Sequence, residues 1–235
     1  EMITALLVSV NYNDYLEISL SHNNKHFQKF VVVTTTSDTK CQQICSSYSN
    51  VVCVVVSDDV LKTNNRVFNK GALLNKGFEY LDSIGWSQWV VITDADIIFP
   101  DNVTELILKQ IPLRNILYSM YRKHLHTFES YKKYFDEHDS TCLQDGGTLE
   151  TCIWPIAIGY CQIFRYTINK YRYDEYNDAD NSDLRFIKYF STQDRWYPDS
   201  PAVKLLSNQD TDFVIHIGET QINWKGRKSV NFEES

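Results

Sequence analysis

Short apolar runs alternate with helical stretches over residues 3–93, and this alternation leaves the chain few folds. The apolar runs are 3–10, 30–33, 51–56 and 89–93, which are strand-sized and rich in β-branched and aliphatic residues. The stretches between them, 15–24, 39–48 and 69–83, have a helical pattern. Near-continuous apolar strands separated by helices predict an α/β fold with a mostly parallel central sheet and helices on both faces.

The second half of the chain has a weaker pattern. Residues 131–138 are charged, and we expect them to be exposed; 177–183 is an acidic turn leading into a helix at 184–190. Residues 116–121 could form a strand, residues 153–164 are apolar, and residues 213–217 are expected to form a last short strand. We expect one domain, with residues 218–235 as its tail.

Composition excludes several classes of partner. The chain has 235 residues, a formal net charge of -7 and no Lys/Arg block, so a nucleic-acid partner is not expected. The longest apolar runs are strand-sized, which predicts no transmembrane segment and a soluble, cytoplasmic chain. An anionic small ligand remains compatible with the acidic balance, because a bound divalent cation supplies positive charge.

The strongest local signal is Asp94-Ala95-Asp96, directly after the strand at 89–93. Ligands of parallel sheets bind beyond the carboxyl ends of the strands, and all four predicted strands end there in polar clusters. Two carboxylates at such an end are suitable oxygen ligands for Mg²⁺ or Mn²⁺, which would hold the phosphates of a nucleotide diphosphate. The alternative is a polar turn without a ligand, since Asp-x-Asp is common.

Several motifs in order resemble the GT-A fold glycosyltransferases. They are Asn11-Tyr12-Asn13, Thr36-Ser37-Asp38, Asn69-Lys70-Gly71-Ala72-x-x-Asn75-x-Gly77 and Val91-Ile92-Thr93-Asp94-Ala95-Asp96. The likeness is nearest to the inverting family 2 type and similar viral or bacterial enzymes. It implies one Rossmann-like GT-A domain over 1–235, with a nucleotide-sugar-binding half at 1–100, an acceptor-binding half at 101–218 and a tail or lid at 219–235.

The resemblance also implies roles for individual residues in donor binding. Asp38 would accept a hydrogen bond from a uracil-like N–H, which favours a UDP-sugar. Arg66 and Lys70 would reach the ribose or diphosphate, although both also fit solvated helix charges. Asp94 would meet the ribose or the metal, and Asp96 would bind the metal directly. The other expected donor contacts are Asn11, Tyr12, Thr35, Asp58 and Ala95.

The end of the chain resembles the C-terminal segment of many GT-A enzymes. There, His216 would be a third metal ligand beside Asp94 and Asp96, and imidazole suits Mn²⁺. Lys225 or Arg227 would neutralise the diphosphate as the tail closes over the donor. The alternative for His216, which follows an apolar strand, is a core histidine.

The acidic turn at 177–183 provides the candidate general base. Inverting GT-A enzymes place an Asp or Glu at the start of a helix here, and Asp183 matches best, with Asp180 as its rival and as an acceptor contact. Some of these residues also fit helix caps. The aromatic residues Trp154, Tyr160 and Trp196 are candidates to stack on acceptor sugars, although large aromatic residues are often core.

These observations predict a glycosyltransferase dependent on Mn²⁺ or Mg²⁺. It would transfer a sugar, with inversion, from a nucleotide-diphosphate sugar to a hydroxyl of a glycan or glycoconjugate. No G-x-G-x-x-G or P-loop pattern is present, and the turn after the first strand is not the Gly- and Arg-rich loop of sugar nucleotidyltransferases. The alternative from another class is a binding module of the same fold without turnover.

Overall fold

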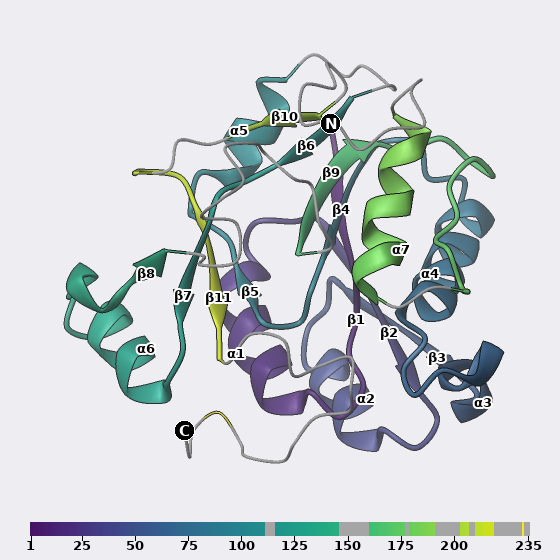
Figure 1. Ribbon diagram of the computed structural model, residues 1–235, viewed down its shortest axis with the longest axis horizontal. Helices are drawn as coiled ribbons and strands as arrows, with labels where there is room; N and C mark the ends of the chain where they lie inside the picture. Colours follow the sequence, from purple (N-terminus) through teal and green to yellow (C-terminus); the bar gives the residue numbers. More distant parts are fainter. Residues whose placement is uncertain are drawn as a thin grey trace.

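A seven-stranded sheet forms the centre of the molecule (Figure 1). The computed structural model describes residues 1–110, 116–145, 160–176, 179–190, 203–206, 210–218 and 232. The strand order is β10-β6-β9-β4-β1-β2-β3. Within the described ranges, β9 pairs antiparallel with β4 and β6, and the other pairings of this sheet are parallel, as the sequence predicted. The strands are β1 (Ile3–Val8), β2 (Lys29–Thr35), β3 (Val51–Val56), β4 (Trp89–Thr93), β6 (Leu117–Ser119), β9 (Cys161–Arg165) and β10 (Val203–Leu205).

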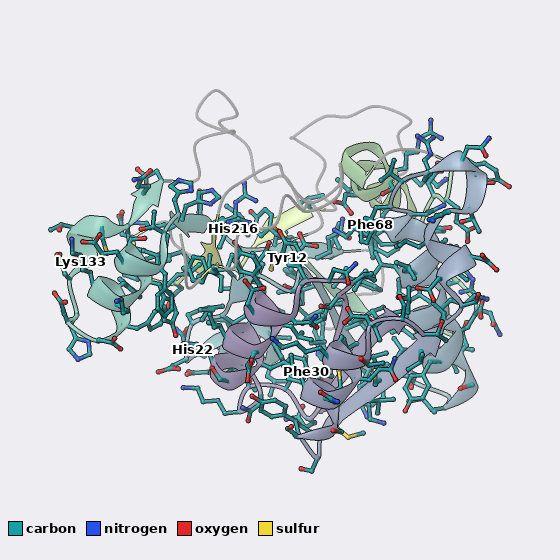
Figure 2. All side chains as sticks on the ribbon, turned by 90° about the horizontal axis from the view of Figure 1, so that it is seen from below. Tyr12, His22, Phe30, Phe68, Lys133 and His216 are labelled. Carbon is teal, nitrogen blue, oxygen red and sulfur yellow. The ribbon has the colours of Figure 1, made fainter. Side chains whose placement is uncertain are left out.

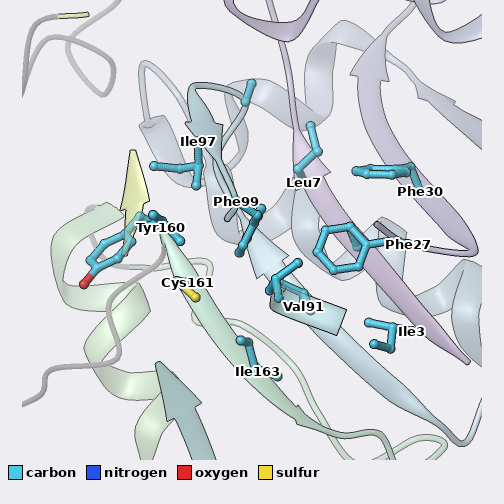
Figure 3. Close-up of a cluster of buried hydrophobic side chains, with 14 of the residues drawn as sticks. Ile3, Leu7, Phe27, Phe30, Val91, Ile97, Phe99, Tyr160, Cys161 and Ile163 are labelled. Carbon is cyan, nitrogen blue, oxygen red and sulfur yellow. The ribbon is translucent and has the colours of Figure 1, made fainter. Parts of the chain in front are cut away.

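Helices cover both faces of this sheet, because its strands carry apolar side chains on both sides. In β1, Ile3 and Leu7 face a core cluster with α1 (Asn13–Asn23), α2 (Thr39–Ser46) and α5 (Val103–Leu108), part of which Figure 3 shows. The alternate residue Leu6 faces a second cluster with α4 (Lys70–Ser83) and α7 (Ala179–Phe186). Among the described residues, none of the helices has the length and apolar character needed to cross a bilayer.

A second, smaller sheet lies beside the first, and the sequence did not predict it. Its order is β5-β11-β7-β8, formed by β5 (Ile97–Ile98), β11 (Val214–Ile217), β7 (Arg122–Leu125) and β8 (Gln144–Asp145). The segment 116–121 forms only the short strand β6 of the large sheet, and the next strand, β7, starts at Arg122. Three of these strands escape prediction because they are short, and β7 contains charged residues within its four positions.

The predicted exposed stretch at 131–138 is also wrong in part. Helix α6 (Phe128–Phe135) is capped by Thr127 and presents aromatic rings to α1. The hydroxyl of Tyr131 lies 2.8 Å from Nε2 of His22, and the ring of Phe135 lies 4.4 Å from the ring of His22. The helix is amphipathic, so its charged face alone suggested a solvated segment. Two short 3₁₀ turns and a one-turn helix also lie within the described residues: η1 (Thr63–Asn65), η2 (Ser140–Cys142) and α3 (Asp58–Leu61).

Helix α7 begins earlier than the sequence predicted. It spans Ala179–Phe186 and continues as a 3₁₀ turn, η3 (Ile187–Tyr189), so Asp183 lies inside the helix and not at its start. The ring of Phe186 stacks on Tyr173, with ring centroids 4.6 Å apart, and lies parallel to Phe78 of α4. The earlier start of α7 goes together with its packing on these rings, and such packing cannot be read from the periodicity of the sequence.

The motif at the start of α4 holds the segment 173–176 against α4. Asn69 caps α4 and also donates from Nδ2 to the Glu175 carbonyl at 3.0 Å. Asn75 donates to the Tyr173 carbonyl at 3.1 Å and accepts from the Tyr173 N–H at 2.7 Å. Gly71 allows the close approach, because a Cβ at this position would lie 2.2 Å from the carbonyl oxygen of Asp174.

We predict that Gly71→Ala lowers the free energy of unfolding by about 1–3 kcal/mol, since the added methyl group must displace the backbone at Asp174. Urea unfolding followed by circular dichroism measures this change. The matched control is Glu79→Ala on the exposed side of the same helix, expected to change stability by less than about 0.5 kcal/mol. Equal stability of Gly71→Ala and the parent chain would mean that the backbone at Asp174 leaves room for a methyl group at position 71.

Candidate functional site

The turns after β1 and β2 are joined by Asp38. Its Oδ2 accepts the Asn11 backbone N–H at 2.7 Å, and its Oδ1 accepts Nδ2 of Asn13 at 3.1 Å. The same Oδ1 caps α2 by accepting the Cys41 N–H at 3.2 Å. Asp38 therefore organises the turns from which a base would be bound; its own contact with a base stays a prediction.

Asp58 lies beside the second turn, where the sequence placed it. Its oxygens accept hydrogen bonds from Ser37 and Thr36, each at 2.5 Å. These hydroxyl donors lower the pKa of the exposed Asp58 carboxyl to about 2. Thr35 is buried within the same turn, and its hydroxyl lies 3.3 Å from that of Ser37. The second turn is thus a polar, ordered edge with a fixed negative charge.

Lys70 lies between two carboxylates. Its Nζ is 2.6 Å from Oδ1 of Asp94 and 3.7 Å from Oδ2 of Asp183. Burial lowers the pKa of Lys70, but the charges of Asp183 and Asp94 outweigh burial, and the net shift is upward. The ammonium is therefore present at any physiological pH. It joins the end of β4 to α7, although these carboxylates are 89 positions apart.

Two residues that were not among the predicted site residues, Tyr173 and Gln162, lie near Asp183. The buried Tyr173 hydroxyl donates to Oε1 of Gln162, whose Nε2 donates to the Asp183 carbonyl at 3.1 Å. Burial and the charges of Asp183 and Asp94 raise the pKa of Tyr173 well above its usual value, so it stays protonated. Tyr173 belongs to no predicted motif, and close packing brings both residues to the site.

Asp96 and His216 are brought together by the small sheet. β11 pairs with β5 so that His216 lies opposite Ile97, and the Ile217 N–H donates to the Asp96 carbonyl at 2.9 Å. Nε2 of His216 lies 3.4 Å from Oδ2 of Asp96. Burial raises the pKa of the Asp96 carboxyl, but His216 and Lys70 outweigh it and the net shift is downward.

The aromatic turn after β1 lies close to this pair. In Figure 2 the labels of His216 and Tyr12 lie next to each other near the middle of the view. Tyr12 stacks on Tyr15 with ring centroids 4.8 Å apart. The Tyr15 hydroxyl lies against Gly218, which has a φ of +88° and directly follows β11. The first turn and the end of β11 thus meet at one edge of the structure.

A buried carboxylate and an imidazole are suitable ligands for Mn²⁺. Over the described ranges, however, no three His, Cys, Asp or Glu side chains are arranged as a metal site. Asp94 faces Lys70, at 2.6 Å. Asp96 and His216 therefore fit a cation as a pair, and Asp94 as the third ligand stays a prediction.

A further histidine, His124 of β7, lies behind His216 and was missed by sequence analysis. The two residues are direct register partners in the parallel β7–β11 pair, and their Nδ1 atoms are 3.2 Å apart. Burial, together with the nearby His216, Arg122 and His126, lowers the pKa of His124 to about 3. The signal in the sequence is the pair His124 and His126 at strand spacing.

The remaining predicted residues fall into two groups. Arg66 donates to the Tyr176 carbonyl, and Ala95 is buried in the core cluster. Tyr160 is also buried, donates to the Met120 carbonyl at 2.8 Å and is covered by the Arg122 guanidinium, which leaves little ring surface for a sugar. Outside the described residues lie Trp154, Trp196, Lys225, Arg227 and the side chain of Asp180.

Comparison with known proteins gives structural likeness only. No protein-family model and no curated protein sequence matches the chain. One similar solved structure is a 4-diphosphocytidyl-2C-methyl-D-erythritol synthase, with TM-score 0.47, 11% identity and coverage of 88% of this chain and 90% of that one. An enzyme of that name from Anaerococcus prevotii has TM-score 0.43, 15% identity and coverage of 94% and 90%.

A glucosyl-3-phosphoglycerate synthase from M. tuberculosis is similar at TM-score 0.45 and 12% identity, covering 87% of this chain and 70% of that one. These values are too low to transfer a function. The function therefore has to be inferred from the residues of this chain.

We predict that Lys70→Met lowers the free energy of unfolding by about 3–5 kcal/mol, because it leaves Asp94 and Asp183 without their buried counter-charge. Adding Asp183→Asn to the same chain recovers part of the loss, since one of the two uncompensated charges is removed. Urea unfolding measures both variants.

Lys76→Met on the same helix is the control for Lys70→Met. Lys76 pairs with Glu79 at a more exposed position, so its loss changes stability by less than about 1 kcal/mol. If Lys70→Met unfolds like the parent chain, the Lys70 ion pairs do not stabilise the fold.

Proposed function

We propose that this chain is a glycosyltransferase that uses a nucleotide-diphosphate sugar, with UDP-sugar favoured, and a divalent cation. The observation that carries the proposal is the convergence of charged groups at the carboxyl end of β4. Lys70 contacts Asp94 and Asp183, and Asp96 contacts His216. Sugar transfer from a nucleotide diphosphate requires a positive charge near the phosphates, a site for a cation and a general base. Lys70, the Asp96–His216 pair and Asp183 would provide these three groups.

Asp96 and His216 would hold the cation, Mn²⁺ or Mg²⁺. Both side chains are buried, at 2% and 6% exposure, and the strand pairing of β11 with β5 fixes their separation. A bound divalent cation stabilises the negative charge of a departing diphosphate.

Lys70 would offset part of the charge that develops on the leaving diphosphate. Its ammonium is permanently charged and is oriented by Asp94 at 2.6 Å, so it needs no reorganisation when charge develops. The turns containing Asn11, Tyr12 and Thr35 would bind the base and ribose at the ends of β1 and β2.

Asp183 would act as the general base. Its carboxylate accepts the proton of the acceptor hydroxyl while the hydroxyl oxygen bonds to the anomeric carbon. The bond from that carbon to the diphosphate oxygen breaks, and the diphosphate leaves with the electron pair. Attack from the opposite face inverts the anomeric centre. Lys70, at 3.7 Å, and the hydrogen bond from Gln162 to the Asp183 carbonyl hold the residue in place.

We expect slow donor hydrolysis when nucleotide-sugars are incubated with the protein and Mn²⁺. Release of free nucleotide diphosphate is measured over a panel of donors, with and without chelator. Chelator-sensitive release from one donor supports the proposal and identifies that donor. If UDP and Mn²⁺ stabilise the fold but no pair of donor and acceptor releases nucleotide diphosphate, a binding module is favoured. If neither stabilisation nor release is observed, the proposal of a nucleotide-sugar site is contradicted.

We expect Asp183→Asn to lower the turnover number about 100- to 10,000-fold while the affinity for the donor changes little, since the amide cannot accept the proton. Turnover is followed with the donor identified by hydrolysis, and donor affinity by calorimetry. Asp136→Asn, at an exposed position after α6, is the control and should retain full activity. Unchanged turnover of Asp183→Asn would remove Asp183 from the mechanism.

A further inference from the structure

The buried imidazole rings of His124 and His216 share a hydrogen bond that has no role in the proposed reaction. The pairing of β7 with β11 places the two residues side by side, with ring centroids 4.9 Å apart. Their exposed fractions are 2% and 6%. The 3.2 Å separation of the Nδ1 atoms is a hydrogen-bond distance, so one of these nitrogens carries a proton and the other accepts it.

Two arrangements in which both rings are neutral satisfy this hydrogen bond. In the first, His124 donates from Nδ1, and the proton of His216 is on Nε2, facing Asp96 at 3.4 Å. In the second, His216 donates from Nδ1 to His124, and Nε2 of His216 carries a lone pair. Only the second arrangement allows Nε2 to bind a metal ion, because a ligating nitrogen must have its lone pair free.

We propose that His124 is a positioning residue that lets His216 exchange between these two tautomers, and so makes Nε2 of His216 available to a cation. This inference rests on the proposed cation site. Without a cation, the first arrangement satisfies the Asp96 carboxylate with an N–H donor. With a cation, the second arrangement applies: the shared proton passes from Nδ1 of His124 to Nδ1 of His216, Nε2 of His216 releases its proton to solvent, and Nε2 of His124 takes one up from solvent. The pair gains and loses no proton overall.

Imidazole is suited to this task because it both donates and accepts while remaining neutral. A carboxylate in place of His124 would accept only, and an ammonium would donate only. A second proton on the ring is disfavoured, because His124 is buried near Arg122, His126 and His216. His126 stacks on His124, with ring centroids 5.2 Å apart and planes within 7°, which orients the ring toward His216.

The first test is nitrogen NMR of ¹⁵N-histidine-labelled full chain, without metal and with Zn²⁺ as a diamagnetic probe. The expected result is an Nε2–H tautomer of His216 without metal and an Nδ1–H tautomer with Zn²⁺, with the opposite tautomers for His124. The same tautomers in both states would overturn the inference and leave the proposed function standing.

The second test is Mn²⁺ affinity, measured by electron paramagnetic resonance with and without UDP. His124→Phe is expected to weaken Mn²⁺ binding about 10- to 100-fold. His124→Asn should restore most of the affinity, since its amide both donates and accepts. His126→Phe retains a ring against His124 and is the control, expected to bind Mn²⁺ like the parent chain.

The outcomes separate this inference from the proposed function. Equal Mn²⁺ affinity of the parent chain and His124→Phe would overturn the role of His124 alone. No Mn²⁺ binding by the parent chain, with or without UDP, would overturn the cation site and this inference with it. If His124→Phe does not fold, the tautomer measurement on the parent chain decides the question.

Discussion

The buried ammonium of Lys70 is the charge on which the site depends. Asp94 at the end of β4 and Asp183 inside α7 both face it, and without it both carboxylates would lose their shared counter-charge, Asp183 in a buried position. The contact requires α7 and the segment 173–176 to pack tightly on α4. Asn69, Asn75 and Gly71 provide that packing. One ion-pair network therefore links the sheet, helix α4 and helix α7.

The small sheet supplies the other half of the site. β11 reaches the end of β4 because it pairs antiparallel with β5, which follows Asp96 directly. His216 is placed next to Asp96 by this pairing, and His124 is placed next to His216 by the parallel pairing of β11 with β7. The proposed cation pair and the imidazole behind it thus depend on backbone hydrogen bonds between strands that are distant in sequence.

The charges of the described residues at this edge favour a phosphate-containing ligand only if a cation adds positive charge. Asp58, Asp94, Asp96 and Asp183 carry negative charge, and the ammonium of Lys70 lies between Asp94 and Asp183. A chain with a net charge of -7 would repel a diphosphate if these carboxylates were uncompensated. The proposed cation on Asp96 and His216 would supply the missing positive charge, which is why the cation and the donor are proposed together.

Much of the fold was determined by the sequence alone, because strand and helix periodicity are local properties. The runs that became β1 to β4 and the helices α1, α2 and α4 between them were predicted, as was the placing of Asp94 and Asp96 at a strand end. Only the tertiary structure decided that Lys70 bridges two carboxylates, that Tyr173 and Gln162 approach Asp183, and that His124 touches His216. These contacts join residues through strand pairing and close packing over long separations, and no local pattern in the chain records such distances.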